Sequence, residues 1–172
     1  MSELFRRPNG QVLPLVEVAK CIASYIATNP TAKYEITVGT DSQTSYKTKM
    51  VEVVAVHRVG SGGIFFYRSD YVSRMSNLRQ KIHEETQRSL SVADGLMLEV
   101  ETALLAYNID LNRLDIRFQI HCDVGHDGST RALIQEIVGW VQAMGYDCMI
   151  KPNSYAASGI ANRYSKNIVS GR

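Results

Sequence analysis

The stretch that decides the fold of this chain is Tyr34-Glu35-Ile36-Thr37-Val38-Gly39-Thr40-Asp41-Ser42-Gln43. Its first half alternates apolar and polar residues and is rich in β-branched side chains, which is typical of a strand. The strand leads into Asp41, which is flanked by hydroxyl and amide side chains. A carboxylate at a strand end lies at the rim of a sheet, where open α/β sheets bind ligands. Asp41 and Ser42 are also compatible with an ordinary turn.

The composition indicates a soluble globular protein. A length of 172 residues suits one domain with a sizeable core, and 45% apolar with 21% charged residues is ordinary. The net charge of +2 is too small to indicate a nucleic-acid binder by itself, so any basic surface has to be local. No apolar run is long enough for a signal peptide or a membrane span. We therefore expect a cytoplasmic protein without membrane association.

The three cysteines, Cys21, Cys122 and Cys148, are odd in number and show no CxxC spacing. This pattern predicts buried thiols in a reducing compartment.

The periodicity on either side of the first stretch predicts a single domain over residues 1–172. Residues 1–13 are expected to be loosely ordered, and Pro14 opens a helix over 14–28. The core is expected over 34–167. Its predicted elements are strands at 34–43, 50–58 and 64–71, a long helix near 76–107 with a break allowed near Ser91 or Gly95, a strand at 114–122, a helix from Asp127 or Ser129 to 144, a strand at 147–151 and a helix at 154–167.

This order predicts an α/β fold with a mixed five-stranded sheet and helices on both faces. Short loops make the first three strands an antiparallel meander. Right-handed crossovers make the fourth and fifth strands parallel to the first. The first and fourth strands are then most simply neighbours.

Three carboxylates are expected to meet at one rim of this sheet. Asp41 ends the first strand and Asp123 ends the fourth, so parallel neighbours bring them together. Glu85 falls inside the apolar stripe of the long helix and therefore faces the sheet. Two alternatives stay open: Asp123 can simply begin the turn before Gly125, and Glu85 can pair with an internal Arg or Lys.

Oxygen ligands of this kind suit Mg²⁺ or Mn²⁺. Without a cation the carboxylates would repel one another and titrate upward. His121 and His126 bracket Asp123 and could relay protons, but packing roles are favoured for both. Zinc is not supported, because no Cys/His set has ligand spacing.

The last predicted helix is polar at its start, where a helix N-terminus attracts phosphate. A substrate-binding surface is therefore predicted there, with a solvated terminal helix as the alternative. Its candidate residues are Lys151, Ser154, Asn162, Arg163 and Lys166.

Four stretches resemble the YkuK-type family of predicted ribonuclease H-like proteins. They are Gly39-Thr40-Asp41-Ser42-Gln43, Lys81-Ile82-His83-Glu84-Glu85-Thr86, Asp123-Val124-Gly125 with Thr130-Arg131, and Lys151 to Ser158 with Ala161 to Lys166. The resemblance implies a ribonuclease H-like fold and a metal-dependent nucleic-acid hydrolase. It makes Asp41, Glu85 and Asp123 the catalytic and metal-binding residues. Asn162 stands where many active members have an acidic residue or a histidine.

The leading hypothesis is therefore an Mg²⁺- or Mn²⁺-dependent nuclease acting on RNA, an RNA–DNA hybrid or structured DNA. The alternative is a non-catalytic nucleic-acid-binding module that keeps the ribonuclease H-like fold.

Overall fold

The structure, a computed structural model, describes residues 3–161. Its described strands are β1 (Leu4–Arg6), β2 (Val12–Pro14), β3 (Lys33–Thr44), β4 (Thr48–Arg58), β5 (Gly62–Val72), β6 (Asp115–His121) and β7 (Asp147–Met149). They form one sheet in the order β2-β1-β5-β4-β3-β6-β7. The pairs from β2 to β3 are antiparallel, whereas β3–β6 and β6–β7 are parallel. The predicted meander and the predicted parallel pairing of the first and fourth core strands are both present.

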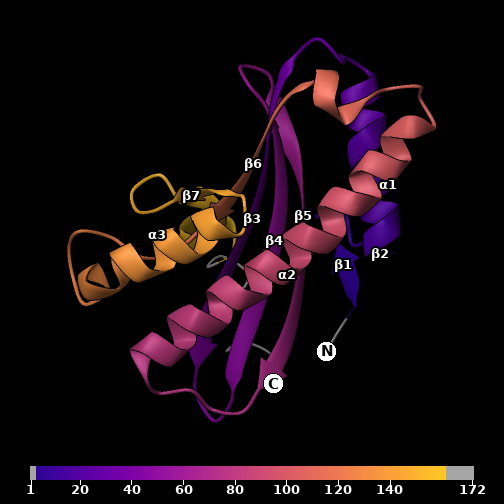
Figure 1. The fold of residues 1–172 in the computed structure, drawn as a ribbon. Helices are drawn as coiled ribbons and strands as arrows, with labels where there is room; N and C mark the ends of the chain where they lie inside the picture. Colours follow the sequence, from indigo (N-terminus) through magenta and orange to yellow (C-terminus); the bar gives the residue numbers. More distant parts are fainter. Residues whose placement is uncertain (1–2, 162–172) are drawn as a thin grey trace.

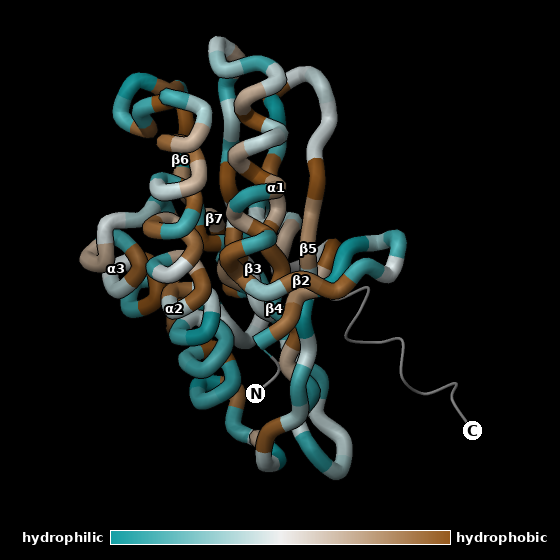
Figure 2. Tube along the Cα trace, turned by 90° about the vertical axis from the view of Figure 1, so that its right-hand side faces the viewer, coloured by the Kyte–Doolittle hydropathy of each residue, from teal (hydrophilic) through white to brown (hydrophobic). Residues whose placement is uncertain are grey.

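Helices pack on both faces of this sheet. The helical segments are α1 (Leu15–Ala27), α2 (Leu78–Leu105), α3 (Ile134–Ala143), two short 3-10 segments, η1 (Leu111–Arg113) and η2 (Arg131–Leu133), and a π-helix, η3 (Ala156–Ala161). The three α-helices share one hydrophobic core with the sheet, and α2 runs diagonally between α1 and α3 (Figure 1). Hydrophobic and hydrophilic positions alternate along the helices (Figure 2), as expected when one side of each packs on a sheet. The opposite face carries η3, which crosses β3 and β4.

The sheet has seven strands, so the prediction of five was wrong. The two additional strands lie within residues 4–14, whereas we expected residues 1–13 to be loosely ordered and Pro14 to open the helix. β1 pairs with β2 and adds to β5, with Arg6 opposite Tyr67. Phe5 is fully buried and Leu13 nearly so. A single inward-facing residue per three-residue strand gives too short an alternation to detect in the sequence.

The predicted long helix is continuous. α2 passes through Gly95 without a break, although glycine lowers helix propensity. A Cβ at Gly95 would lie 3.1 Å from Leu15 Cδ2, so the missing side chain allows α1 to approach α2 closely. At the position where the sequence suggested a break in the helix, the glycine instead allows a close contact between α1 and α2.

Two later helices differ from their predicted bounds. α3 begins at Ile134, so Asp127 and Ser129 do not cap it. The last predicted helix is described only as far as Ala161, and it is a π-helix there. None of the helices in the described part of the chain combines the length and hydrophobicity that crossing a membrane requires.

Candidate active site

The open edge of β3 positions the candidate site. The β3–β6 ladder ends where Gly39 pairs with His121, but β3 continues to Thr44 in its ladder with β4. Asp41 therefore lies just past the last β3–β6 pair, and Asp123 lies two residues past the end of β6. Both residues are at the same end of these strands, as the sequence predicted.

Glu85 of α2 reaches this edge from the helix-covered face. Thr40 Oγ1 and Ser89 Oγ are hydrogen-bonded at 2.8 Å, and Ser42 Oγ donates to Glu85 Oε1 at 2.5 Å. These contacts fix α2 against the end of β3. Side chains alternate along a strand, so Asp41 belongs to the opposite face, which carries η3. Glu85 and Asp41 thus approach each other around the open edge of β3.

Glu85 is a strongly perturbed carboxyl group of the site. Its pKa is raised to about 8, chiefly by burial and also by the negative charges of Asp41 and Asp123, while the Ser42 hydrogen bond and the charge of Lys81 act in the opposite direction. Glu85 and Asp123 also line one small hollow. No ion pair of Glu85 with an Arg or Lys is found in residues 3–161, so the alternative of a structural salt bridge is not supported.

Among the described residues, Lys151 is the cation paired with Asp123. Lys151 Nζ lies 3.0 Å from Asp123 Oδ1, an oxygen that is shielded from solvent and for which no hydrogen-bond partner is found in residues 3–161. The predicted substrate-binding residue Lys151 therefore does lie at the carboxylate edge, but its ammonium group is placed on Asp123.

The carboxylate oxygens of Asp41, Glu85 and Asp123 are of the chemical type that binds a hard divalent cation. Carboxylate oxygens are the ligands that Mg²⁺ and Mn²⁺ prefer, and a cation would relieve the repulsion that raises the pKa of Glu85. The shielded Asp123 Oδ1 is a further available acceptor. However, within the described residues no three His, Cys, Asp or Glu side chains are grouped closely enough to hold a metal ion. The metal role of Asp41, Glu85 and Asp123 stays a prediction.

His121 has a packing role, as expected. It is buried, and burial lowers its pKa to about 4, so the ring is neutral at physiological pH. His121 Nδ1 accepts a hydrogen bond from Ala156 N at 3.1 Å, and Tyr155 stacks edge-on against the ring at 4.6 Å. This histidine therefore attaches η3 to β6. His126 is exposed.

One other predicted substrate-binding residue lies within the described part of the chain. Ser154 is fully buried, so its hydroxyl group is not presented to a ligand at the surface, contrary to the predicted role. The sequence indicated a polar helix start but not the depth at which it lies. Asn162, Arg163 and Lys166 lie outside the described residues.

Sequence reasoning missed two residues that shape the site. Ser42 was noted only as a hydroxyl beside Asp41, yet it is the hydrogen-bond donor to Glu85. Its position one residue after Asp41 in a strand is the signal that could have placed it on the helix-covered face. The other residue is Cys148, whose Sγ lies 3.9 Å from Cys122 Sγ. Cys122 is buried as predicted, whereas Cys21 and Cys148 are partly exposed.

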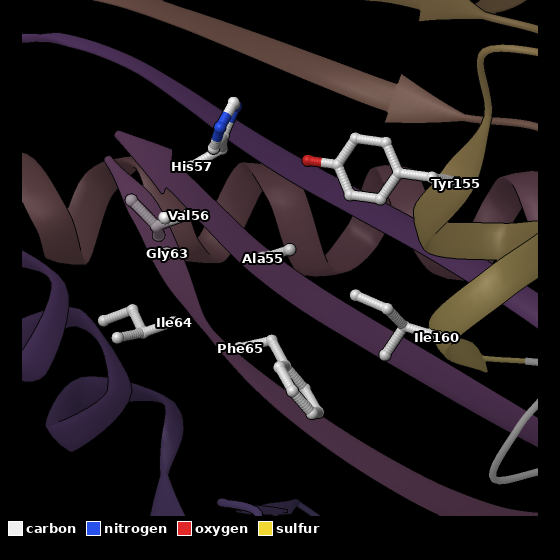
Figure 3. Close-up of a pocket in the computed structure, with 9 residues that line it drawn as sticks. Ala55, Val56, His57, Gly63, Ile64, Phe65, Tyr155 and Ile160 are labelled. Carbon is white, nitrogen blue, oxygen red and sulfur yellow. The ribbon is translucent and has the colours of Figure 1, made fainter. Parts of the chain in front are cut away.

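A separate groove of about 360 Å³ lies on the η3 face, away from the carboxylates. Figure 3 shows the Tyr155 hydroxyl directed toward His57 at one end, with Phe65 and Ile160 at the other. The His57 Nδ1–Glu35 Oε2 distance beside it is 3.4 Å. The lining is mainly apolar, so this groove does not resemble a metal site.

Comparison with known proteins agrees with the fold. The model of the ribonuclease H-like family matches residues 17–166. The chain therefore belongs to the ribonuclease H-like family, and this membership indicates a nuclease-type or nucleic-acid-related function. It is also 33% identical over 172 residues to the uncharacterized protein YkuK of Bacillus subtilis (strain 168), covering 96% of this chain and 98% of that protein. No solved structure gives a significant match.

Proposed function

We propose that this protein is a divalent-metal-dependent nuclease that hydrolyses phosphodiester bonds in RNA, an RNA–DNA hybrid or structured DNA. The observation that carries the proposal is the raised pKa of Glu85, to which Asp41 and Asp123 both contribute. Strongly perturbed carboxyl groups cluster at functional sites, because catalytic acids and bases need pKa values matched to their task and burial and like charges produce such shifts. Family membership supplies the reaction class.

Asp41, Glu85 and Asp123 are the residues that would hold Mg²⁺ or Mn²⁺. A bound ion of this kind activates water and stabilises the charge that develops on the phosphate in the transition state. Ser42 fixes the orientation of Glu85 through the 2.5 Å hydrogen bond. The β3–β6 ladder ends at Gly39, so Asp41 lies beyond the paired part of this edge, where a sugar–phosphate backbone would approach the carboxylates.

The test is a cleavage and binding assay of Asp41→Asn. We expect loss of cleavage with binding largely retained, because binding rests on phosphate contacts that weaken as salt rises. The substrates are labelled RNA, hybrid, single-stranded DNA and junction DNA with Mg²⁺ or Mn²⁺. Asp115→Asn is the matched control, because Asp115 is exposed at the far end of β6. Asn162→Asp should raise activity if the missing fourth carboxylate limits turnover.

A non-catalytic nucleic-acid-binding module is the second candidate. The observation that favours it is the Lys151–Asp123 ion pair, which already neutralises one of the three carboxylates. Salt-sensitive binding without cleavage of any substrate, in the wild type and in Asn162→Asp, would decide for the binding module.

A further inference from the structure

A polar groove of about 510 Å³ lies between α2 and α3. The first three turns of α2 form one wall of this groove, and Trp140 of α3 forms the other. Its volume is typical of a site that holds a small molecule or part of a larger ligand. Asp41, Glu85 and Asp123 do not line it, so it is separate from the carboxylate edge.

The basic side chains of the groove are engaged by a carboxylate. Arg79 donates to both carboxylate oxygens of Glu136, at 3.0 and 2.9 Å. His83 Nε2 lies 2.8 Å from Glu136 Oε1. Glu84, on the same wall, accepts a hydrogen bond from Arg88 at 2.7 Å. The arrangement is therefore not suited to a phosphate group, which would have to compete with Glu136 for both basic side chains.

The groups that remain for a ligand are neutral, an aromatic ring and side-chain amides. Trp140 is the only tryptophan of the chain. Part of its side chain packs against the hydrophobic core and part lines the groove, with the His83 ring centroid 5.7 Å from its own. Gln80 and Gln87 are exposed on the α2 wall, and each amide offers donors and an acceptor. A fixed aromatic ring beside amide groups matches a nucleobase, which stacks on one and hydrogen-bonds to the other.

The groove is next to the proposed nuclease site along α2. His83 and Glu84 line the groove and directly precede Glu85, whose side chain turns to the edge of β3. One helical turn advances only about 5.4 Å. A strand bound at the carboxylates therefore has the groove within reach of one of its bases.

We propose that this groove binds an unpaired nucleobase of a single-stranded segment. The base stacks on Trp140 and hydrogen-bonds to Gln80 and Gln87. A base inside a duplex cannot enter, because its neighbours cover its faces and its partner covers its edge. The inference rests on the proposed function for the class of ligand, and it selects substrates with a single-stranded segment. It applies to the nuclease and to the binding module alike, so it can fail separately from cleavage.

The fluorescence of the single tryptophan tests the inference directly. The full chain is titrated in EDTA, which prevents metal-dependent cleavage, with a single-stranded RNA and with a blunt duplex of the same sequence. Anisotropy of the labelled nucleic acid follows binding in parallel. Stacking should quench Trp140 emission with the single strand and leave it unchanged with the duplex. Equal quenching by both, or binding of the single strand without quenching, would overturn the inference.

Variants of the groove test the contacts one kind at a time. Trp140→Leu keeps an apolar side chain against the core but removes the stacking surface, and it should weaken single-strand binding roughly tenfold. Gln80→Ala combined with Gln87→Ala should weaken it roughly fivefold. Both losses should be equal at low and high salt, because these contacts involve no phosphate. Tyr107→Leu and Gln142→Ala are the matched controls, since both residues are exposed outside the groove and should bind as the wild type does.

Thermal melting verifies that each variant is folded. The paired glutamine variant changes only exposed positions, so it tests the groove even if Trp140→Leu does not fold. Wild-type affinity in this variant would overturn the inference, and cleavage by the wild type would then leave the nuclease proposal standing alone. An absence of binding to any nucleic acid, with EDTA or with Mn²⁺, would overturn both.

Discussion

Two clusters of acidic side chains lie next to each other along helix α2. They differ in the number of Arg and Lys side chains that pair with them. Arg88 lies on the sheet side of α2 and joins three carboxylates, with N–O distances of 2.7 Å to Glu84, 2.7 Å to Asp70 and 3.4 Å to Glu52. Arg68 of β5 also pairs with Glu52. Glu85, three residues before Arg88, lies near two further carboxylates at the edge of β3, where Lys151 pairs only with Asp123.

The comparison contrasts a neutralised charge network with one that is not neutralised. Two guanidinium groups neutralise most of the acidic charge around Glu52 and hold α2 to β4 and β5. Glu85 is buried without a paired Arg or Lys among the described residues, and its pKa is raised to about 8, chiefly by burial. Burial of an unneutralised charge is costly, and under the proposed function a divalent cation would supply the missing charge. Four predictions test this difference.

The largest effect is expected from breaking the structural network. Arg88→Met leaves Asp70 and Glu52 with less positive charge in a buried place, so we expect the free energy of unfolding to fall by about 4 kcal/mol. Arg79→Met is the control, since Arg79 of α2 pairs with Glu136 of α3 at 2.9 Å on the exposed surface and should lose less than about 1 kcal/mol. Urea unfolding measures both. Equal losses in the free energy of unfolding would mean that the Arg88 network contributes no more to stability than an exposed ion pair.

The next effect is a pH dependence that originates in Glu85. Because its folded-state pKa is raised to about 8, the folded protein holds this proton more tightly than the unfolded chain. The contribution of Glu85 to stability should therefore decline as pH rises from about 5 to about 8, by about 3 kcal/mol in EDTA. The lowered pKa of His121 acts equally in both proteins, so the difference between the wild-type and Glu85→Gln stability curves, and not either curve alone, should show this decline. Parallel curves for the two proteins would show that Glu85 is already ionised in the fold.

A divalent ion should supply the missing charge and stabilise the fold. Binding only to the native state adds about 2.7 kcal/mol at 100 times the dissociation constant. We expect Mn²⁺ to raise the melting temperature relative to EDTA, and Asp123→Asn to reduce this shift. Asp115→Asn should keep the full shift. Melting temperatures that do not respond to millimolar Mn²⁺ would argue against a metal site at this edge.

The smallest effect should come from Ser42→Ala. This variant removes the hydrogen bond that opposes the rise in the pKa of Glu85, so that pKa should rise further, with a stability loss of about 1 kcal/mol. Ser89→Ala removes a neighbouring hydroxyl pair with Thr40, and it should cost a similar stability without moving the pKa of Glu85. A carbon-13 NMR titration of the Glu85 carboxyl group distinguishes the two variants. If the pKa of Glu85 is unchanged in Ser42→Ala, the hydrogen bond from Ser42 does not position Glu85.

Local patterns were sufficient for most of the fold. The alternation in residues 34–43 predicted β3, and the order of strands and helices predicted the meander and the parallel β3–β6 pair. The apolar stripe of α2 placed Glu85 on the buried side, where it lies with 7% of its surface exposed. Periodicity of this kind is a property of consecutive residues, so it can be recognised without any knowledge of what lies opposite.

The tertiary structure decided which groups meet. Arg88 and Glu85 both lie on the buried side of α2, and only the strands beneath them determine that one finds carboxylates and the other finds Ser42. β1 forms by pairing with the edge of β5. Lys151 reaches Asp123 because Gly125 has no side chain to obstruct the aliphatic part of the lysine. The sequence by itself determined the elements and the side to which each residue points. The partner of each charge was decided by tertiary contacts. Electrostatic interaction depends on the distance between two groups, and local sequence patterns do not give distances between segments that are far apart in the chain.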